Sequence, residues 1–150
     1  MSENENPNAR SIELSRTSTG HYTARNAAGA EVAFGQGEGL LSPVELLLAA
    51  IAGCSAIDVD IATSRSAEPT KFAVTASGDK VVDEGGANRM DHLKLAFDLA
   101  FNDDADGRKA ASMVERLVAL SHDKYCTVSR TVEHGTAVAT SVAVSTEGEA

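Results

Sequence analysis

Two cysteines carry the most distinctive chemistry in this chain. Cys54 and Cys126 are its only cysteines and lie far apart in the sequence, so only the fold can bring them together. A thiolate attacks peroxides and disulfides, whereas a thiol buried in apolar surroundings is inert. Two cysteines are too few for a disulfide scaffold, and such a pair is catalytic, metal-binding or simply buried. The surrounding sequence must distinguish these roles.

Local surroundings favour reactivity at Cys126. This residue directly precedes a predicted short helix over residues 127–134, whose unpaired N–H groups and dipole favour a thiolate, and Lys124 and Arg130 are close in sequence. Cys54 lies within an apolar predicted helix, where desolvation raises the pKa of a thiol unless a cation arrives from elsewhere. On local grounds, an inert buried thiol remains an alternative for each cysteine.

Histidines near the cysteines raise a zinc site as another alternative. His122 is four residues before Cys126, and His134 is the last residue of the predicted short helix. Together with the two cysteines, these histidines would supply four side chains of the kinds that bind zinc. No CxxC or HxxxH spacing supports this arrangement, so we expect surface histidines and no metal site.

Cys54 lies at the centre of a long predicted helix within residues 42–66. Ser42 is the expected N-cap, followed by a proline at the first helical position and by Glu45 three residues after the cap, which is a capping box. Apolar residues fall on every side of the helix, so we expect protein to surround it and residues 46–57 to form the core. Small side chains near Cys54 would let another backbone approach closely.

The rest of the chain is predicted to contain short strands and two further helices. Alternating apolar residues and turn signals predict strands at 12–17, 21–26, 30–34, 71–82, 92–102 and 136–145. Helical spacing predicts helices at 106–121 and at 127–134, the second closed by Gly135. This order indicates an α+β fold with mostly antiparallel neighbours.

Length and charge restrict the partners of the chain. Its 150 residues suggest one domain over residues 11–146, between a disordered tail at 1–10 and a frayed acidic tail at 147–150. A formal net charge of −9 argues against binding to nucleic acid or anionic membranes. No signal peptide or transmembrane run is expected, which makes the cytoplasm the default location. A chain of this length is short for enclosing an apolar helix alone, so we expect a dimer.

Two motifs surround the cysteines. The first is Ser-Pro-Val-Glu-Leu-Leu-Leu at 42–48, followed by Ala-Gly-Cys at 52–54 and Ile-Asp-Val-Asp at 57–60; the second is Tyr-Cys-Thr-Val-Ser-Arg at 125–130. Together they resemble the OsmC/Ohr family of thiol-dependent hydroperoxide reductases. The resemblance is closest to the OsmC-like branch, whose helix reads Pro-Met-Glu-Leu, then Gly-Gly-Cys or Ala-Gly-Cys, then Ile-Asp-Val-Val. The order of elements is similar over residues 12–145.

The resemblance implies an OsmC/Ohr-like fold in an intertwined homodimer, with the long helices packed centrally between sheets and an active site at the subunit interface. It implies that Cys54 is the peroxidatic cysteine, which attacks an organic hydroperoxide and becomes a sulfenic acid. Cys126 is then the resolving cysteine, which forms a disulfide with Cys54 that a dithiol reductant opens. No metal or cofactor is implied.

The family also carries a Glu near the start of the long helix and an Arg from the N-terminal strands, which polarise the cysteine. Val44 stands at the position of the Ohr glutamate and Glu45 follows it, so Glu45 is either a catalytic carboxylate or only a helix cap. Nine residues of helix place Glu45 and Cys54 on opposite faces, about 13 Å apart along the axis. If Glu45 assists a peroxidatic cysteine, we therefore expect it to be the partner subunit's Cys54. Arg16 matches the arginine by region, with an exposed strand arginine as the alternative.

The sequence therefore predicts a cytoplasmic, metal-free peroxidase for organic hydroperoxides. The apolar part of the substrate would lie in an interface pocket lined by the long helix. The alternative is a divergent OsmC-like, stress-associated protein that binds an apolar ligand with little or no peroxidase turnover.

Overall fold

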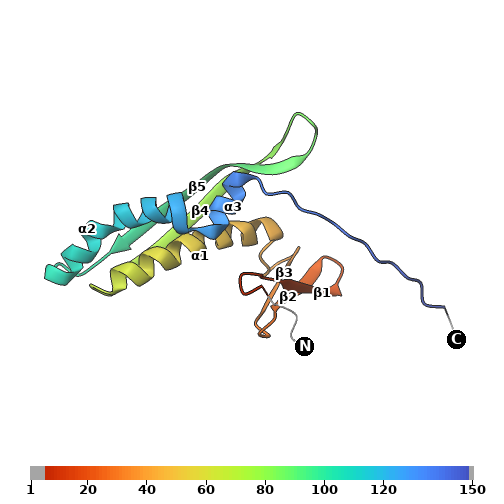
Figure 1. The fold of residues 1–150 in the computed structure, drawn as a ribbon, viewed down its shortest axis with the longest axis horizontal. Helices are drawn as coiled ribbons and strands as arrows, with labels where there is room; N and C mark the ends of the chain where they lie inside the picture. Colours follow the sequence, from red (N-terminus) through yellow and green to blue (C-terminus); the bar gives the residue numbers. More distant parts are fainter. Residues whose placement is uncertain (1–5, 149–150) are drawn as a thin grey trace. The chain divides into compact units, whose positions relative to one another are not determined.

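The structure is a computed structural model that describes residues 6–148, and its element order is the predicted α+β order up to the last helix (Figure 1). The elements are β1 (Ile12–Ser18), β2 (His21–Asn26), β3 (Glu31–Gly35), α1 (Pro43–Ser64), β4 (Lys71–Val82), β5 (Asn88–Ala100), α2 (Ala105–Leu120), the π-helical turn η1 (Ser121–Tyr125) and α3 (Thr127–His134).

These elements form two compact units. The first unit holds the residues up to Ala50 together with Ala76–Lys94, and the second holds Ile51–Thr75 together with the residues from Leu95 onward. Both α1 and the β4–β5 hairpin contribute to each unit.

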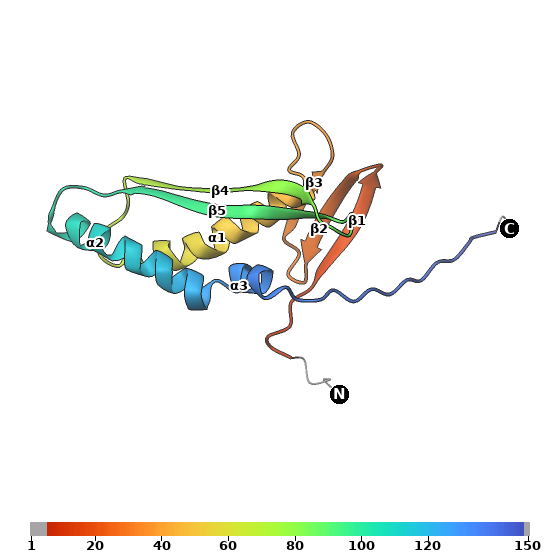
Figure 2. The same cartoon turned by 90° about the horizontal axis from the view of Figure 1, so that it is seen from above.

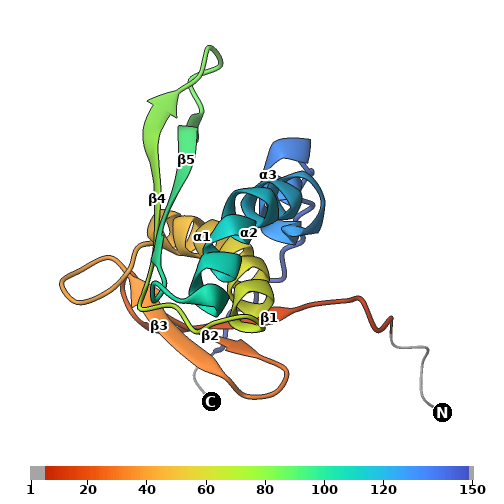
Figure 3. The same cartoon turned by 90° about the vertical axis from the view of Figure 1, so that its left-hand side faces the viewer.

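In the first unit, β1, β2 and β3 form an antiparallel meander, coloured red to orange in Figure 3. Its last residue, Gly35, must be glycine, because a Cβ there would lie 2.1 Å from the carbonyl oxygen of Gly20. The N–H of Gly35 donates to the carbonyl of Leu41 at 3.0 Å, which turns the chain toward the start of α1. The predicted meander is thus confirmed, with strand ends that differ by one residue in β1 and β3.

The N-terminus of α1 is the predicted capping box. The N–H of Glu45 donates to Ser42 Oγ at 3.1 Å, and Glu45 Oε1 accepts from the N–H of Ser42 at 2.9 Å. These two bonds satisfy two of the N–H groups that a helix start leaves unpaired. The backbone N–H of Ser42, and its hydroxyl beside the carboxylate, lower the pKa of Glu45.

Replacing Ser42 with alanine removes one half of this capping box. We expect Ser42→Ala to lower the free energy of unfolding by about 1 kcal/mol, measured by urea unfolding at a fixed protein concentration. The matched control is Ser112→Ala, which deletes an exposed hydroxyl inside α2. An equal decrease in the free energy of unfolding in both variants would mean that the capping hydroxyl adds no stability beyond that of an ordinary exposed hydroxyl.

Helix α1 is buried along one stripe and not on all sides. Its buried residues are Ile51, Ser55, Val59 and Thr63. They recur every four positions, so they share one face. Ile57 on another face is 59% exposed, and Leu47 and Ile61 are exposed too. The prediction that residues 46–57 form the core is therefore wrong for the single chain, whose other residues cover only one side of α1. By length and composition α1 could also cross a membrane, a property that core helices of soluble proteins share.

The β4–β5 hairpin is longer than predicted, because β5 begins at Asn88 and not at His92. Asp83 makes the turn short: its carboxylate accepts from the N–H groups of Gly85 and Ala87 at 2.9 and 3.0 Å. The polar residues that follow this turn pair with β4 as the first residues of β5. They are polar because they are largely exposed in a strand, and not because they form a loop.

In the second unit, α2 runs beside α1, and α3 follows α2 through the turn η1 (Figure 2). Asp104 caps α2 by accepting from the N–H of Gly107 at 2.7 Å. The turn η1 was not predicted. It closes with the N–H of Cys126, which donates to the carbonyl of Ser121 at 2.7 Å, and it places Cys126 directly before α3.

The predicted last strand, 136–145, is absent. Residues 136–148 have no helix or strand and leave α3 as an extended, exposed segment (Figure 1). A strand needs a hydrogen-bonding neighbour, and the described residues of this chain offer none to this segment. Residues 6–10 form no helix or strand either. The remainder of the predicted tails, residues 1–5 and 149–150, lies outside the described range.

Candidate functional site

Both cysteines belong to the second unit, and the fold brings their side chains together. Cys54 lies in the middle of α1, and Cys126 is the N-cap residue of α3. The Cys126 thiol lies near enough to the Cys54 thiol to raise the pKa of Cys54, and both cysteines are free. The two thiols are therefore near each other within one chain, and a disulfide between them remains a prediction.

The two thiols differ in their accessibility. Cys126 is 0% exposed. Its Sγ caps α3 by accepting from the N–H of Ser129 at 3.4 Å and donates to Ser129 Oγ at 3.2 Å. Cys54 is only partly buried. A reagent from solvent therefore meets Cys54 first and reaches Cys126 only through it or after a movement of the chain.

The N-terminus of α3 faces both thiols. Burial raises the pKa of the Cys54 thiol, the backbone N–H groups of Val128 and Thr127 lower it, and the neighbouring Cys126 thiol raises it further, so that the net shift is upward. The first N–H groups of a helix have no partner within the helix, and here they point to sulfur. Sequence reasoning assigned this help to Cys126 alone, because nothing local to Cys54 indicates that α3 packs there.

Two residues close to Cys126 in sequence, Arg130 and His122, are paired with Glu133. Arg130 Nη1 pairs with Glu133 Oε2 at 3.2 Å, and His122 Nε2 lies 3.1 Å from the other oxygen of the same carboxylate. Within residues 6–148, no group of three or more His, Cys, Asp or Glu side chains could hold a metal ion. The zinc arrangement with His122 and His134 is therefore not formed.

Glu45 and Arg16 belong to the first unit, where each makes a local hydrogen bond. Glu45 is exposed and forms the capping box with Ser42. Arg16 is exposed on β1, and its Nη2 donates to Thr19 Oγ1 at 3.0 Å. Within one chain, Glu45 therefore acts as a cap and Arg16 as a surface arginine. A role of either residue at the thiol of a partner subunit remains a prediction.

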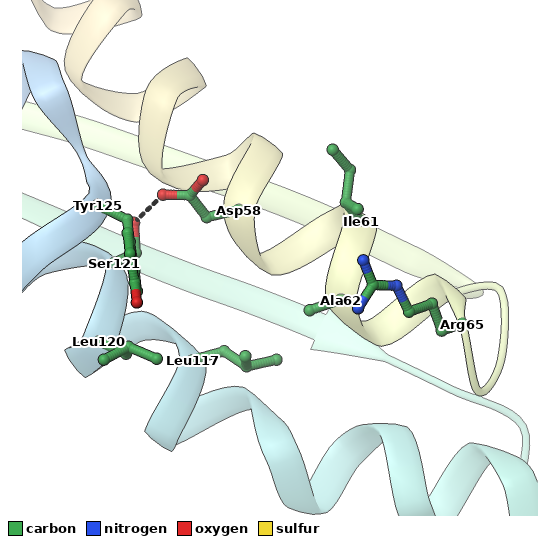
Figure 4. Close-up of a pocket in the computed structure, with 8 residues that line it drawn as sticks. All are labelled: Asp58, Ile61, Ala62, Arg65, Leu117, Leu120, Ser121 and Tyr125. Carbon is green, nitrogen blue, oxygen red and sulfur yellow. Dashed lines mark hydrogen bonds between the residues drawn. The ribbon is translucent and has the colours of Figure 1, made fainter.

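A polar cluster beside the thiols was missed by sequence reasoning. Ser121 Oγ donates to Asp58 Oδ2 at 2.7 Å and lies 3.3 Å from Ser55 Oγ. Figure 4 shows this Asp58–Ser121 bond at the edge of a pocket of about 240 Å³, whose walls include Ile61 and Leu117. Neither cysteine lines that pocket. A serine and an aspartate so far apart in sequence give no local signal of this contact.

The raised pKa of Cys54 predicts a pH dependence. Only the thiolate reacts with iodoacetamide. Because the pKa lies above its ordinary value of 9.0, less than half of Cys54 is ionised at pH 9, and the rate of alkylation should still be rising there. Peptide mapping of the alkylated chain between about pH 6 and 10 measures this rate. A plateau reached below about pH 8 would show that a cation outside this chain lowers the pKa.

The family model described as OsmC-like protein matches residues 35–141, a range that includes both cysteines. The chain belongs to the OsmC-like family. No curated protein matches it.

Solved structures share the fold of this OsmC-like chain. A hypothetical protein from Aquifex aeolicus VF5 is 24% identical, with a TM-score of 0.67 over 85% of this chain and 89% of that chain. An OsmC-like protein of unknown function from Vibrio cholerae is 14% identical, with a TM-score of 0.63 over 89% and 95% of the two chains. The organic hydroperoxide resistance protein OhrB of Bacillus subtilis is 17% identical, with a TM-score of 0.53 over 83% and 90%. At these identities the likeness establishes the fold alone, and the predicted OsmC/Ohr-like fold of the chain is confirmed.

Proposed function

We propose that this OsmC-like protein is a thiol-dependent peroxidase for organic hydroperoxides, with Cys54 as the peroxidatic and Cys126 as the resolving cysteine. The observation that carries the proposal is that one partly exposed thiol and one buried thiol lie near each other at the N-terminus of α3. Membership of the OsmC-like family and the fold shared with OhrB support the same chemistry.

The cycle has three steps. The Cys54 thiolate attacks the terminal oxygen of the hydroperoxide, the O–O bond breaks, and the alkoxide takes a proton and leaves as an alcohol, while Cys54 becomes a sulfenic acid. The Cys126 thiol then attacks the Cys54 sulfur, so that a disulfide forms and water leaves. A dithiol, in a reducing compartment such as the cytoplasm, restores both thiols by two exchange steps and is itself oxidised.

The positions of the two thiols suit these roles. Peroxide must reach the first thiol, and Cys54 is the accessible one. The second thiol must wait next to the first without reacting with peroxide, and Cys126 is buried there. The N–H groups of Thr127 and Val128 stabilise negative charge on the Cys54 sulfur, so they favour the attacking thiolate against the effect of burial.

The test is hydroperoxide consumption by the reduced protein. With dithiothreitol in excess, we expect repeated turnover of cumene hydroperoxide. Without reductant, one equivalent of cumene hydroperoxide should leave a chain that is lighter by two hydrogen atoms. After digestion with trypsin, the peptides that contain Cys54 and Cys126 should be joined by a disulfide. Unchanged mass and no consumption would contradict the proposal.

One observation favours the alternative of a protein that binds an apolar ligand with little turnover. The pKa of Cys54 is raised, mainly by burial, so the single chain holds a small fraction of the thiolate at neutral pH. On this alternative, cumene hydroperoxide would be consumed no faster than by free dithiothreitol, while cumyl alcohol would still bind. The turnover assay therefore separates the two functions.

We also propose that the protein is a homodimer, as its resemblance to the family implies. The buried apolar residues of the described chain are few: Ile51, Val59, Ala110 and Cys126. One face of α1 carries small and apolar residues, and an added Cβ at Gly53 would meet nothing within 4 Å. In the C-terminal segment, Val138, Val142 and Val144 are 87, 85 and 86% exposed. Surfaces of this kind are typical of chains that associate.

Sedimentation equilibrium tests this dimer. We expect about twice the chain mass of 15.6 kDa. Ile57→Glu, which puts a charge on the exposed face of α1, should shift the protein toward monomer. Lys109→Glu on the exposed face of α2 is the matched control and should remain dimeric. A parent protein that sediments as a monomer would contradict the proposal.

A further inference from the structure

Ser121 connects α1 to the turn that holds Cys126. Its side chain contacts Asp58 and Ser55 on α1, at 2.7 and 3.3 Å. Its carbonyl accepts the N–H of Cys126 at 2.7 Å, which closes the π-helical turn η1. Ser121 and Ser55 are both 1% exposed, and Asp58 is partly buried, so water has little access to the two hydroxyls. One residue therefore ties the position of Cys126 to the helix that carries Cys54.

The hydrogen bonds of this cluster run in one direction. A hydroxyl has one hydrogen, and the hydrogen of Ser121 is used in the bond to Asp58. The hydroxyl of Ser55 is therefore the donor to Ser121, and Asp58 is the final acceptor. A bond to a carboxylate is stronger than a bond between neutral groups, so Asp58 contributes most of the stabilisation.

The cluster lies along the same part of α1 as the peroxidatic thiol. Ser55 follows Cys54 directly, and Asp58 comes four residues after it, which places Asp58 next to Cys54 on the helix surface. The bonds from α1 to Ser121 thus fix the separation between α1 and η1 close to the two thiols. Asp58 takes part in no step of the proposed cycle, so its connection to Ser121 needs another explanation.

We propose that Asp58 and Ser121 are positioning residues for disulfide formation: their hydrogen bond holds η1 against α1, so that the Cys126 thiol stays within reach of the Cys54 sulfur. This inference rests on the resolving step of the proposed function. The π-helical turn suits the task, because such turns are rare and are frequent at functional sites. Without the tie, η1 and Cys126 would move more freely relative to α1, and the effective concentration of one thiol near the other would fall.

The test is the equilibrium of the Cys54–Cys126 disulfide in glutathione redox buffers, with no hydroperoxide present. Ser121→Ala removes the tie and should lower the equilibrium constant for closure by about tenfold, the effect of one lost charge-assisted hydrogen bond. Asp58→Asn leaves a neutral and weaker bond and should give a smaller drop in the same direction. Ser121→Thr restores the hydroxyl and should recover the parent value. Asp60→Asn, two residues away on the exposed side, is the matched control.

The readouts separate positioning from general stability. Circular dichroism identifies the temperatures at which each reduced variant is folded, and the equilibrium is compared there. The rate of Cys54 alkylation should stay near that of the parent, because the tie acts on the partner thiol. Closure that is equally favourable in the parent, Ser121→Ala and Asp58→Asn would overturn the inference, and so would a parent that forms no disulfide. A parent that closes in glutathione but consumes no hydroperoxide would contradict only the proposed peroxidase function.

Discussion

Cys54→Ser should reduce hydroperoxide consumption by at least about 100-fold, because a serine hydroxyl is not ionised at neutral pH and does not attack the O–O bond. Every later step depends on the sulfenic acid at this position. No other cysteine can replace it from solvent, since Cys126 is 0% exposed. The measurement is the loss of cumene hydroperoxide with excess dithiothreitol, corrected for the reaction of dithiothreitol alone.

The control for Cys54→Ser is the fold of the variant. Serine is close to cysteine in size, and residue 54 is only partly buried, so circular dichroism and sedimentation should match the parent. Dimedone, which labels sulfenic acids, should mark the peroxide-treated Cys126→Ser protein and leave Cys54→Ser unmarked. Consumption that persists in Cys54→Ser would remove Cys54 from the mechanism.

Cys126→Ser should separate the first step of the cycle from the second. The initial oxidation of Cys54 should stay within about threefold of the parent rate, because the attacking thiol is intact. The disulfide cannot form, so the sulfenic acid persists, and repeated turnover with dithiothreitol should fall by about tenfold or more. Stopped-flow measurement of the single turnover, followed by the steady-state assay, gives both rates on the same sample.

This variant should fold, for a reason visible at α3. Cys126 caps that helix by accepting from the N–H of Ser129, and serine is a preferred residue at an N-cap. Cys126→Ala lacks the acceptor and serves as the comparison for stability. Equal steady-state turnover in the parent and Cys126→Ser would show that the dithiol reduces the sulfenic acid directly, and Cys126 would lose its role as resolving cysteine.

Sequence patterns predicted most of the regular elements, because the interactions that define them are local. The capping box of Ser42 and Glu45, the strand β2, the strand β4 and the helix α3 with its C-cap Gly135 lie where the patterns indicate. The early start of β5 was missed, because its first residues are polar and show no apolar alternation. Their place in a strand depends on pairing with β4, which a local pattern does not reveal. The turn η1 was missed too, because no residue pattern distinguishes a π-helical turn from the end of an α-helix.

The sequence predicted the two cysteines of the candidate site but not the groups that surround them. Motifs around Cys54 and Cys126 indicated the pair and the family. They did not indicate that the N–H groups of Thr127 and Val128 face Cys54, or that Asp58 binds Ser121. Those contacts join segments distant in sequence, and no local pattern encodes the packing of one helix end on the side of another.

By itself, the sequence determined the type and order of most helices and strands, which two side chains can do redox chemistry, and the family. Local hydrogen bonds, capping and apolar periodicity are sufficient for the first, and residue chemistry and motifs for the others. Only the tertiary structure decided that the two thiols lie near each other, that one is partly exposed while the other is buried, and that residues 136–145 form no strand. The physical reason is that burial and strand pairing are properties of what lies next to a residue in space, which a position in the chain does not specify.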